Sequence, residues 1–305
     1  MQPVMEEVII GGSSAQVFAL KLAKESGIPL LKLDLRKFPD GERYIRVLGD
    51  VDGKTVNVVQ SMYMQPDDFL LEYFLIADNL RDMGAPKIRG IIPYFAYARQ
   101  DGRFNPGEAF SLKTVCNIIE SVGTNEVYTI DLHLHRIESI SKLFKIPSTN
   151  LTVVPDLARY FKQSVKMKNP AVIGPDEEAE QWAKVAAKEL DADYDILEKH
   201  RVTSDEKGKF GEVEIKPREL SMKGRDALII DDIISTGGTI VQAINVLRKN
   251  GVNKVYVATS HPVLVENALV KVLEAGAEMV VGSDTIPSPI SFVSAAPTVA
   301  RGIRR

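Results

Sequence analysis

Residues 227–240 read Ala-Leu-Ile-Ile-Asp-Asp-Ile-Ile-Ser-Thr-Gly-Gly-Thr-Ile, and this stretch decides the fold that we expect. Four apolar residues followed by a charged pair predict a buried strand, whereas the apolar positions at Ile240, Ile244 and Leu247 recur at helical spacing. The polar residues between them therefore form a tight turn that leads from a strand into a helix.

This turn is suited to binding a phosphate group. It consists of Ser235, Thr236, Gly237, Gly238 and Thr239. These residues place backbone N–H groups and three hydroxyls at a helix N-terminus, where unpaired donors and the helix dipole favour an anion. The two adjacent glycines let the backbone approach a phosphate without a clash from a Cβ atom.

Two carboxylates precede the turn. Asp231 and Asp232 are acceptors that suit two neighbouring sugar hydroxyls or a bound Mg²⁺ ion. A sugar phosphate is the simplest ligand that matches both features. The alternative is that the acidic pair only begins a turn and that residues 236–239 only cap a helix, but such a cap rarely needs both tandem glycines and paired acids.

Length and composition limit the classes of protein that fit. The chain has 305 residues, which is enough for two ordinary domains, and its 45% apolar and 26% charged content is typical of soluble globular proteins. The formal net charge of -3 gives no electrostatic reason to expect nucleic acid or an anionic membrane as a partner.

The single cysteine, Cys116, lies in an apolar run and is expected to be a core residue in a reducing compartment. With no membrane-length apolar run and no signal-peptide pattern at residues 1–7, we expect a cytoplasmic protein.

Apolar strand-like segments alternate with amphipathic helical runs along the whole chain. Strands are expected at 8–10, 30–35, 55–60, 88–95, 127–132, 171–174, 194–197, 227–230, 255–259 and 278–281. Helices are expected at 15–24, 69–83, 112–122, 154–164, 177–190, 240–247 and 265–275. This alternation favours parallel sheets with helices on both faces.

The two halves of the chain resemble one another. The motif Gly-x-Asn-charged-Val-Tyr occurs at 123–128 and again at 251–256, a separation of 128 residues. Asn117 and His133 match Asn245 and His261 at the same separation. We therefore predict two copies of one α/β domain, comprising residues 1–150 and 151–305.

The segment Gly49-Asp-Val-Asp-Gly-Lys-Thr55 superficially matches a nucleotide-binding phosphate loop. It has three residues between its glycines where that motif needs four, and a strand pattern follows it instead of a helix. We predict a hairpin turn here.

Three further polar segments in the first half can carry chemistry. Phe38-Pro-Asp-Gly-Glu42 offers an aromatic face and the acceptors Asp40 and Glu42, which suit a nucleobase, although a Pro-Asp-Gly turn is usually only a hairpin connection. Residues 93–101 end a strand with Arg99, Gln100 and Asp101, a group that suits a polyphosphate or, alternatively, forms a salt-bridged surface loop.

The third segment, Asp131-Leu-His-Leu-His135, closes another strand. His133 could ligate Mg²⁺ or donate to a phosphate, whereas His261 is expected only to be hydrogen-bonded. A zinc pair formed by His133 and His135 is disfavoured because no third soft ligand has a sensible spacing.

In order along the chain, these motifs resemble those of ribose-phosphate diphosphokinases, also called phosphoribosyl diphosphate synthases. The matching segments are 38–42, 93–101, 131–133, 174–176, 199–201 and 231–239. The resemblance spans nearly the whole chain. It implies two tandem phosphoribosyltransferase-type domains, each a largely parallel sheet flanked by helices, with the ATP side in the first domain and the ribose 5-phosphate side in the second.

Members of that family transfer the diphosphoryl group of Mg–ATP to the anomeric hydroxyl of ribose 5-phosphate, giving 5-phosphoribosyl 1-diphosphate and AMP for nucleotide biosynthesis. The resemblance implies that ATP is bound by Phe38, Asp40, Glu42, Arg99, Gln100, Asp101 and His133. It implies that Ser235 to Thr239 hold the 5-phosphate and that Asp231 and Asp232 hold the ribose hydroxyls. It also implies that His133 holds one Mg²⁺ ion and Asp176 a second. Lys199, Arg201 and His133 are the implied catalytic residues, with residues 203–211 as a mobile loop or, alternatively, a solvated charged hairpin.

The resemblance also implies a homo-oligomer, at least a dimer, because the adenine-binding loop of the family comes from a neighbouring subunit. Two departures stand out. Ser235 replaces an Asp that many members carry, and the loop 102–110 looks closer to archaeal members than to those regulated by ADP. The competing functions are a phosphoribosyltransferase and a catalytically silent regulator that binds the sugar phosphate.

Overall fold

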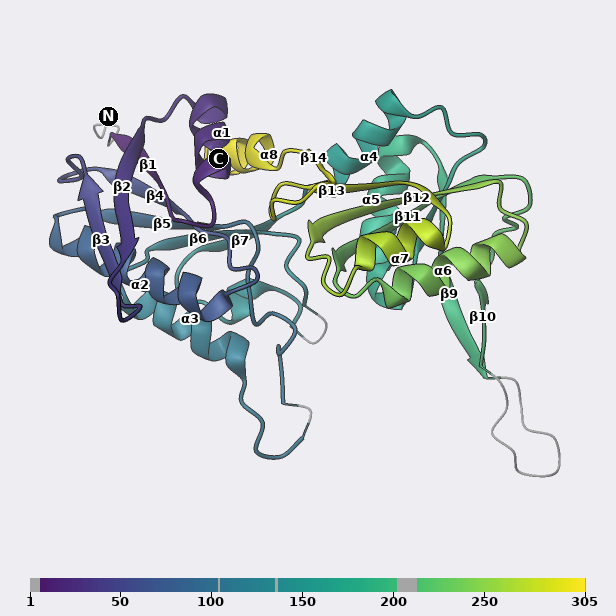
Figure 1. The fold of residues 1–305 in the computed structure, drawn as a ribbon, viewed down its shortest axis with the longest axis horizontal. Coiled ribbons are helices and arrows are strands. Elements are labelled where there is room, and N and C mark those ends of the chain that lie inside the picture. The colour runs from purple at the N-terminus through teal and green to yellow at the C-terminus, as the bar shows by residue number, and fades with distance from the viewer. Residues whose placement is uncertain (1–5, 104, 135–136, 202–212, 305) are drawn as a thin grey trace. The chain divides into compact units, whose positions relative to one another are not determined.

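The computed structural model describes residues 6–103, 105–134, 137–201 and 213–304, and it divides the chain into two compact units (Figure 1). The first unit comprises the chain up to Thr152 together with the residues from Ser294 onward, and the second comprises Val153–Val293. This division differs from the expected one at the end of the chain, which we had assigned to the second domain. The reason is that the last helix, α8 (Ala296–Ile303), packs on α1 (Gln16–Ser26), and Arg304 donates to the Ser26 carbonyl at 2.7 Å.

The first unit is built on a seven-stranded sheet with the order β3-β2-β1-β4-β5-β6-β7. Neighbouring strands are parallel, except that β2 and β3 form an antiparallel hairpin. The strands are β1 (Glu7–Gly11), β2 (Leu30–Lys37), β3 (Arg43–Leu48), β4 (Thr55–Val59), β5 (Lys87–Ile92), β6 (Glu126–Ile130) and β7 (Ser148–Leu151). The remaining elements are α2 (Pro66–Asp82), α3 (Ser111–Ser121) and the 3₁₀ turn η1 (Ile140–Lys142). Helices α1 and α8 cover one face, and α2 and α3 cover the other (Figure 1).

The second unit repeats this topology, with the order β10-β9-β8-β11-β12-β13-β14 and one antiparallel pair, β9 with β10. Its strands are β8 (Ala171–Gly174), β9 (Asp193–Arg201), β10 (Val213–Pro217), β11 (Asp226–Ile234), β12 (Lys254–Pro262), β13 (Ala277–Ser283) and β14 (Ser291–Val293). Its helices are α4 (Val154–Ser164), η2 (Glu177–Ala179), α5 (Glu180–Leu190), α6 (Gly238–Lys249) and α7 (Ala268–Glu274). The expected fold class, two tandem α/β domains with largely parallel sheets, is confirmed.

The sequence match that suggested the duplication aligned the wrong strands. It paired β6, the sixth strand of the first sheet, with β12, the fifth strand of the second. The two motifs match because their asparagines have the same structural role at the start of a strand. Asn125 accepts from the Ile88 amide at 2.7 Å, and Asn253 donates to Asp226 at 2.7 Å, so each asparagine ties the start of its strand to the start of the preceding one.

The segment 49–55 is a turn, as predicted, but it is not a hairpin. It joins β3 to β4, which are separated in the sheet by β2 and β1. No helix begins after it, since β4 follows directly. The rejection of a nucleotide-binding phosphate loop is therefore confirmed.

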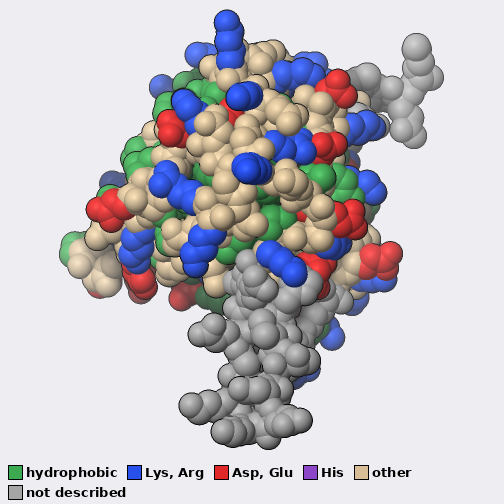
Figure 2. Space-filling view, turned by 90° about the vertical axis from the view of Figure 1, so that its right-hand side faces the viewer, with side chains coloured by type: hydrophobic (Ala, Val, Ile, Leu, Met, Phe, Trp, Pro, Cys, Tyr) green, Lys and Arg blue, Asp and Glu red, His purple; other side chains and the backbone are tan. Residues whose placement is uncertain are grey.

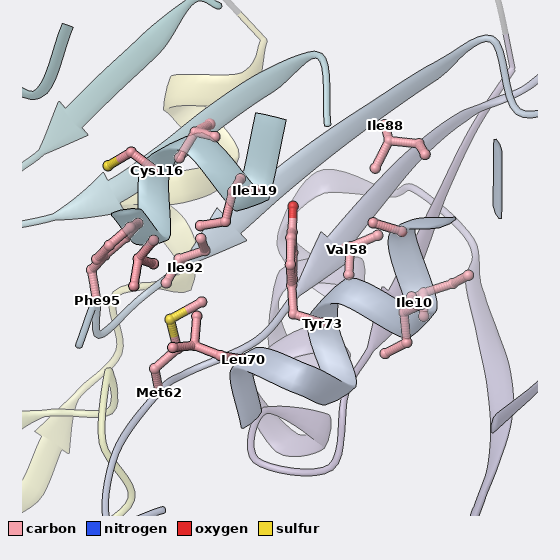
Figure 3. Packing of buried hydrophobic residues seen from close by; sticks show 14 of the residues in the cluster. Ile10, Val58, Met62, Leu70, Tyr73, Ile88, Ile92, Phe95, Cys116 and Ile119 are labelled. Atoms are coloured by element: carbon pink, nitrogen blue, oxygen red, sulfur yellow. The ribbon is translucent and has the colours of Figure 1, made fainter. Parts of the chain in front are cut away.

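The core of the first unit lies between the sheet and the helices α2 and α3 (Figure 3). Tyr73 is fully buried there, and its hydroxyl lies 2.8 Å from that of Thr124. Cys116 is also fully buried, and burial raises the pKa of its thiol to about 12. The expectation that this cysteine is a core residue is confirmed. Within the residues described, no helix is both long and apolar enough to cross a membrane.

A buried polar network joins the neighbouring strands β4, β5 and β6 of the first sheet. Arg89, 6% exposed, donates from Nε to Glu126 at 3.0 Å and from Nη1 to Asn57 at 2.9 Å. Lys87 and Tyr128 also reach Glu126, at 2.6 and 2.8 Å. Burial acts to raise the pKa of Glu126, but the hydrogen bonds from Lys87, Arg89 and Tyr128 outweigh it and lower that pKa.

We predict that Glu126→Gln destabilises the protein in a pH-dependent way. A carboxylate with a lowered pKa contributes stability above its ordinary pKa of 4.5 and loses it as the pH falls through the lower folded-state value. The loss should be about 2 kcal/mol at pH 7, because the hydrogen bonds are charge-assisted, and should shrink below pH 4. Thermal unfolding followed by circular dichroism from pH 3 to 7 measures it, with the exposed Glu25→Gln as control. An equal Tm deficit at all pH values would contradict the assignment.

Candidate functional site

The turn between β11 and α6 has the features of an anion site. Strand β11 ends at Ile234 and α6 begins at Gly238. No described side chain caps this helix, and its first turn contains no acidic residue. Because the first N–H groups and the positive end of the helix dipole are not matched by a capping or acidic side chain, they can attract an external anion.

The two glycines of this turn differ in what they do. Gly237 has φ = 79°, and a Cβ atom there would lie 3.2 Å from the Ala268 carbonyl oxygen, so the fold itself requires glycine. Gly238 has no positive φ, and a Cβ atom there would meet only the Thr236 hydroxyl, at 3.9 Å. Nothing described in the structure explains Gly238, whereas a ligand that approaches the backbone closely would.

Three carboxylates lie near one another beside this turn. Asp231 and Asp232 belong to β11 itself and extend past the last residue that pairs with β8, Ile229. Asp232 is 2% exposed. Burial first, and then the charges of Asp232 and Asp176, raise the pKa of Asp231 well above its ordinary value.

A cation would relieve the mutual repulsion of these carboxylates. Asp176 uses one oxygen to cap η2, accepting from the amides of Glu178 and Ala179 at 3.1 and 3.3 Å. The described residues contain no group of three or more side chains with the geometry of a metal site. Phosphate oxygens of a substrate and water would therefore have to complete the shell of a Mg²⁺ ion, which is how this metal is usually held.

Strand order places the remaining second-unit candidates at the same end of the sheet as these acids. Lys199 and Arg201 lie on β9, opposite Ile215 and Val213 of β10. The strands β9, β8 and β11 are consecutive neighbours, so the segments that carry the predicted residues share one end of the sheet. The side chains of Lys199 and Arg201, and the predicted mobile loop 203–211, lie outside the described residues.

In the first unit, two predicted segments lie at neighbouring strand ends. Arg99, Gln100 and Asp101 follow β5, and His133 follows β6, which pairs with β5 in parallel. The Arg99 side chain is exposed, the Gln100 side chain accepts a hydrogen bond from the Ser111 hydroxyl, and Asp101 is 2% exposed. Among these, Arg99 is the side chain most accessible to a ligand.

The segment 38–42 is the tip of the β2–β3 hairpin, as the simpler alternative predicted. The Phe38 amide donates to the Glu42 carbonyl at 2.8 Å, and Gly41 adopts φ = 96°. The Phe38 ring is half exposed and meets Tyr44 edge-on at 6.0 Å. Strand β2 is three strands away from β5, a separation of about 14 Å at the usual strand spacing, so the sheet does not bring Phe38 and Arg99 together.

Of the two histidines His261 and His135, the structure describes only the first. His261 is buried, and its Nδ1 lies 2.9 Å from the Thr285 hydroxyl, which confirms its expected hydrogen-bonded role. His135 lies outside the described residues, so the zinc pair with His133 is not examined by the structure.

One feature of the first unit was not predicted from the sequence. Helix α2 occupies the same place in its sheet as α6 does in the second, yet it carries Asp67 and Asp68 in its first turn. One turn later, Glu72 is fully buried and accepts from the Ser13 amide at 2.7 Å and the Ser13 hydroxyl at 2.8 Å. In the sequence these acids look like an ordinary solvated helix face. The only signal of another role is spacing: Asp67 lies three residues before the buried Leu70, and Glu72 lies four before the buried Ile76.

A duplicated α/β domain whose second copy joins paired acids to a glycine-bearing helix N-terminus defines a protein of the phosphoribosyltransferase fold. Comparison with known proteins narrows this class. A family profile described as the N-terminal domain of ribose phosphate pyrophosphokinase matches residues 7–123, and a phosphoribosyl transferase domain profile matches residues 149–280.

Similar proteins cover nearly the whole chain. The ribose-phosphate pyrophosphokinase of Methanothermobacter thermautotrophicus is 40% identical over 96% of this chain and 98% of its own, and that of Methanobrevibacter smithii is 38% identical over 97% and 100%. The crystal structure of phosphoribosylpyrophosphate synthetase from Mycobacterium smegmatis superposes with a TM-score of 0.84 at 26% identity and covers 98% of each chain. The chain therefore belongs to the ribose-phosphate pyrophosphokinase family, and the expected likeness to archaeal members is confirmed.

We predict that alanine at the two turn glycines has opposite effects on stability. Gly237→Ala forces a side chain into a left-handed backbone and against Ala268, which should cost about 2–4 kcal/mol. Gly238→Ala should leave Tm unchanged or slightly raised, because alanine is the better helix former. Thermal unfolding of both variants measures this contrast. A large loss of stability in Gly238→Ala would show that the fold, and not a ligand, requires that glycine.

Proposed function

We propose that this protein transfers the β,γ-diphosphoryl group of Mg–ATP to the anomeric hydroxyl of ribose 5-phosphate, releasing AMP and 5-phosphoribosyl 1-diphosphate for nucleotide biosynthesis. Membership of the ribose-phosphate pyrophosphokinase family supports the reaction. The single observation that carries the sugar-phosphate part is that the Asp231 and Asp232 carboxylates lead into the N-terminus of α6 at Gly238, a glycine that nothing described in the fold requires.

The second unit is proposed to bind ribose 5-phosphate. Ser235, Thr236, Gly237, Gly238 and Thr239 would hold the 5-phosphate through backbone amides and hydroxyls. Asp231 and Asp232 would accept from the 2- and 3-hydroxyls. The proximity of the two carboxylates supports this, since adjacent sugar hydroxyls are donors with a matching separation.

The first unit is proposed to bind ATP. The exposed guanidinium of Arg99 offers planar donors for the triphosphate, with Gln100, Asp101 and His133 at the same sheet edge. Phe38 would stack on adenine, and Asp40 and Glu42 would accept from its exocyclic amine. All three lie at the exposed hairpin tip, about 14 Å from the Arg99 segment by strand spacing. The family resemblance is the basis for proposing a homo-oligomer, at least a dimer, in which the hairpin serves a neighbouring subunit.

The carboxylates near Asp176 fit a hard cation such as Mg²⁺, and His133 of the first unit is proposed to hold another. The clustered negative charge around Asp231 is the observation behind this assignment, together with the oxygen-rich donor set. When bound, Mg²⁺ would neutralise charge on the polyphosphate and leave the β-phosphorus open to attack.

In the transfer, the anomeric oxygen forms a bond to the β-phosphorus while the bond from that phosphorus to the α,β-bridging oxygen breaks. Lys199 and Arg201, on the arm formed by β9 and β10, are proposed to bring two cations to the charge that develops on the bridging oxygen and the transferred group. Ser235 supplies a hydroxyl where many family members have a carboxylate, so the anomeric proton has no carboxylate acceptor at that position.

The remaining proposals concern partners and location. On the face shown in Figure 2, Lys and Arg side chains are interspersed with Asp and Glu and do not gather into one basic patch. This distribution and the net charge of -3 support a protein that acts on small molecules and binds neither nucleic acid nor a membrane. We propose that it is cytoplasmic.

The function predicts AMP release that depends on ribose 5-phosphate. Purified protein with Mg–ATP should produce AMP and 5-phosphoribosyl 1-diphosphate only when ribose 5-phosphate is added. Lys199→Ala and Arg201→Ala should lower kcat far more than they raise either KM, because their cations act chiefly in the transition state. Sugar-phosphate binding without AMP release would indicate a regulator, and AMP made only from 5-phosphoribosyl 1-diphosphate and adenine would indicate a phosphoribosyltransferase.

We further predict that loss of either acid of the pair weakens sugar-phosphate binding far more than Mg–ATP binding. Asp231→Ala and Asp232→Ala should weaken ribose 5-phosphate binding about tenfold or more, since a charge-assisted hydrogen bond is worth about 1.5–3 kcal/mol. Mg–ATP affinity should be largely unchanged, because both acids lie in the second unit. Isothermal titration calorimetry with each ligand measures both affinities. Unchanged sugar-phosphate affinity in both variants would refute the assignment.

A further inference from the structure

Two carboxylates of α2 hold both roots of the Phe38 hairpin. Lys37, the last residue of β2, approaches Asp68 with an Nζ–Oδ2 distance of 2.7 Å. Arg43, the first residue of β3, lies 3.2 Å from the same oxygen and also forms an ion pair with Glu72. The hairpin is therefore attached to α2 at the level where its tip begins.

Glu72 is a rigid anchor for this attachment. Its side chain is fully buried, and besides Arg43 it accepts from the amide and hydroxyl of Ser13 and from Gln60 Nε2 at 2.9 Å. The Arg43 side chain is 11% exposed. The several partners of the Glu72 carboxylate restrict its position more than an exposed ion pair would, although Arg43 Nε is buried without a hydrogen-bond partner among the described residues.

The neighbouring acid on α2 holds the Arg99 segment. The Tyr97 hydroxyl donates to Asp67, and this hydrogen bond raises the pKa of Tyr97. Tyr97 adopts φ = 64°, a conformation that L-residues rarely adopt and that persists only where the surroundings hold it. The Gln100 amide in turn donates to the Tyr97 carbonyl at 3.0 Å, so the position of Tyr97 sets that of the residues after it.

We propose that Asp67, Asp68 and Glu72 form an acidic bracket that positions both segments to which ATP binding is assigned, the hairpin tip 38–42 and the loop 97–101. This inference rests on the proposed function of those segments. In the second unit, the corresponding helix N-terminus carries no acid and is left for an external phosphate. In the first unit, the protein supplies its own carboxylates there, and they bind side chains of the nucleotide segments.

Two variants each release one segment. Asp68→Ala removes the contacts to Lys37 and Arg43, and Tyr97→Phe removes the hydroxyl that reaches Asp67. Asp78→Asn is the matched control, because it removes an exposed carboxylate of the same helix that forms an ion pair with Arg81. Hydrogen–deuterium exchange of the apoprotein should rise about fivefold in residues 37–43 for Asp68→Ala and in residues 94–101 for Tyr97→Phe, and in neither for the control.

Steady-state kinetics provide the second readout. Both variants should raise KM for ATP about three- to tenfold at unchanged KM for ribose 5-phosphate, and Asp68→Glu should restore the parent value. Equal changes in both KM values with a lowered Tm, or unchanged exchange in both segments, would overturn the inference. If the parent protein releases no AMP, the proposed function fails, while the exchange experiment still decides whether the bracket holds these segments.

Discussion

The burial of β11 is the constraint on which the geometry of the second unit depends. Residues 227–230 have no exposed surface, and the strand lies between β8 and β12. A one-residue slip would turn every side chain to the other face of the sheet, so the register is strongly determined. The start of α6 is thereby fixed, and so is the point at which Asp231 and Asp232 pass beyond β8. This arrangement buries Asp231 beside two other carboxylates, which disfavours its ionised form and raises its pKa.

Duplication gave the two units one topology but different electrostatics. The hairpin β2–β3 and the hairpin β9–β10 occupy the same place in their sheets, and the proposed roles assign the first to adenine and the second to the transferred phosphates. The helices α2 and α6 likewise follow equivalent strands. The first turn of α2 contains two acidic residues, whereas that of α6 contains none. A few charges at equivalent positions thus distinguish a structural site from the proposed ligand site on one scaffold.

The sequence predicts the central strands well because they are continuous apolar runs, as in β11. It does not reveal the edge strands β7 and β14, which are the short segments Ser-Thr-Asn-Leu and Ser-Phe-Val. Their strand structure comes from pairing with a neighbour, and local propensity does not determine it. The repeated sequence motif paired non-equivalent strands for a related reason. Asn125 and Asn253 each hydrogen-bond the start of a strand to its neighbour, and this role can occur at more than one position in a sheet. The proximity of Asp176 to Asp231 depends on the order of strands in the sheet, which spacing along the chain does not give. The burial of Glu72 depends on partners far away in the sequence, such as Ser13, and is equally hidden from local spacing.

The packing of α8 on α1 has a consequence for biosynthesis. Because the first unit takes its last helix from the end of the chain, the whole of Val153–Val293 is an insertion between two parts of one domain. A ribosome therefore releases the complete second unit before the first unit can bury Leu151 against Gly302. During synthesis, the N-terminal half must wait in an unfinished state with one face of its sheet only partly covered, which reverses the usual order in which N-terminal domains fold first.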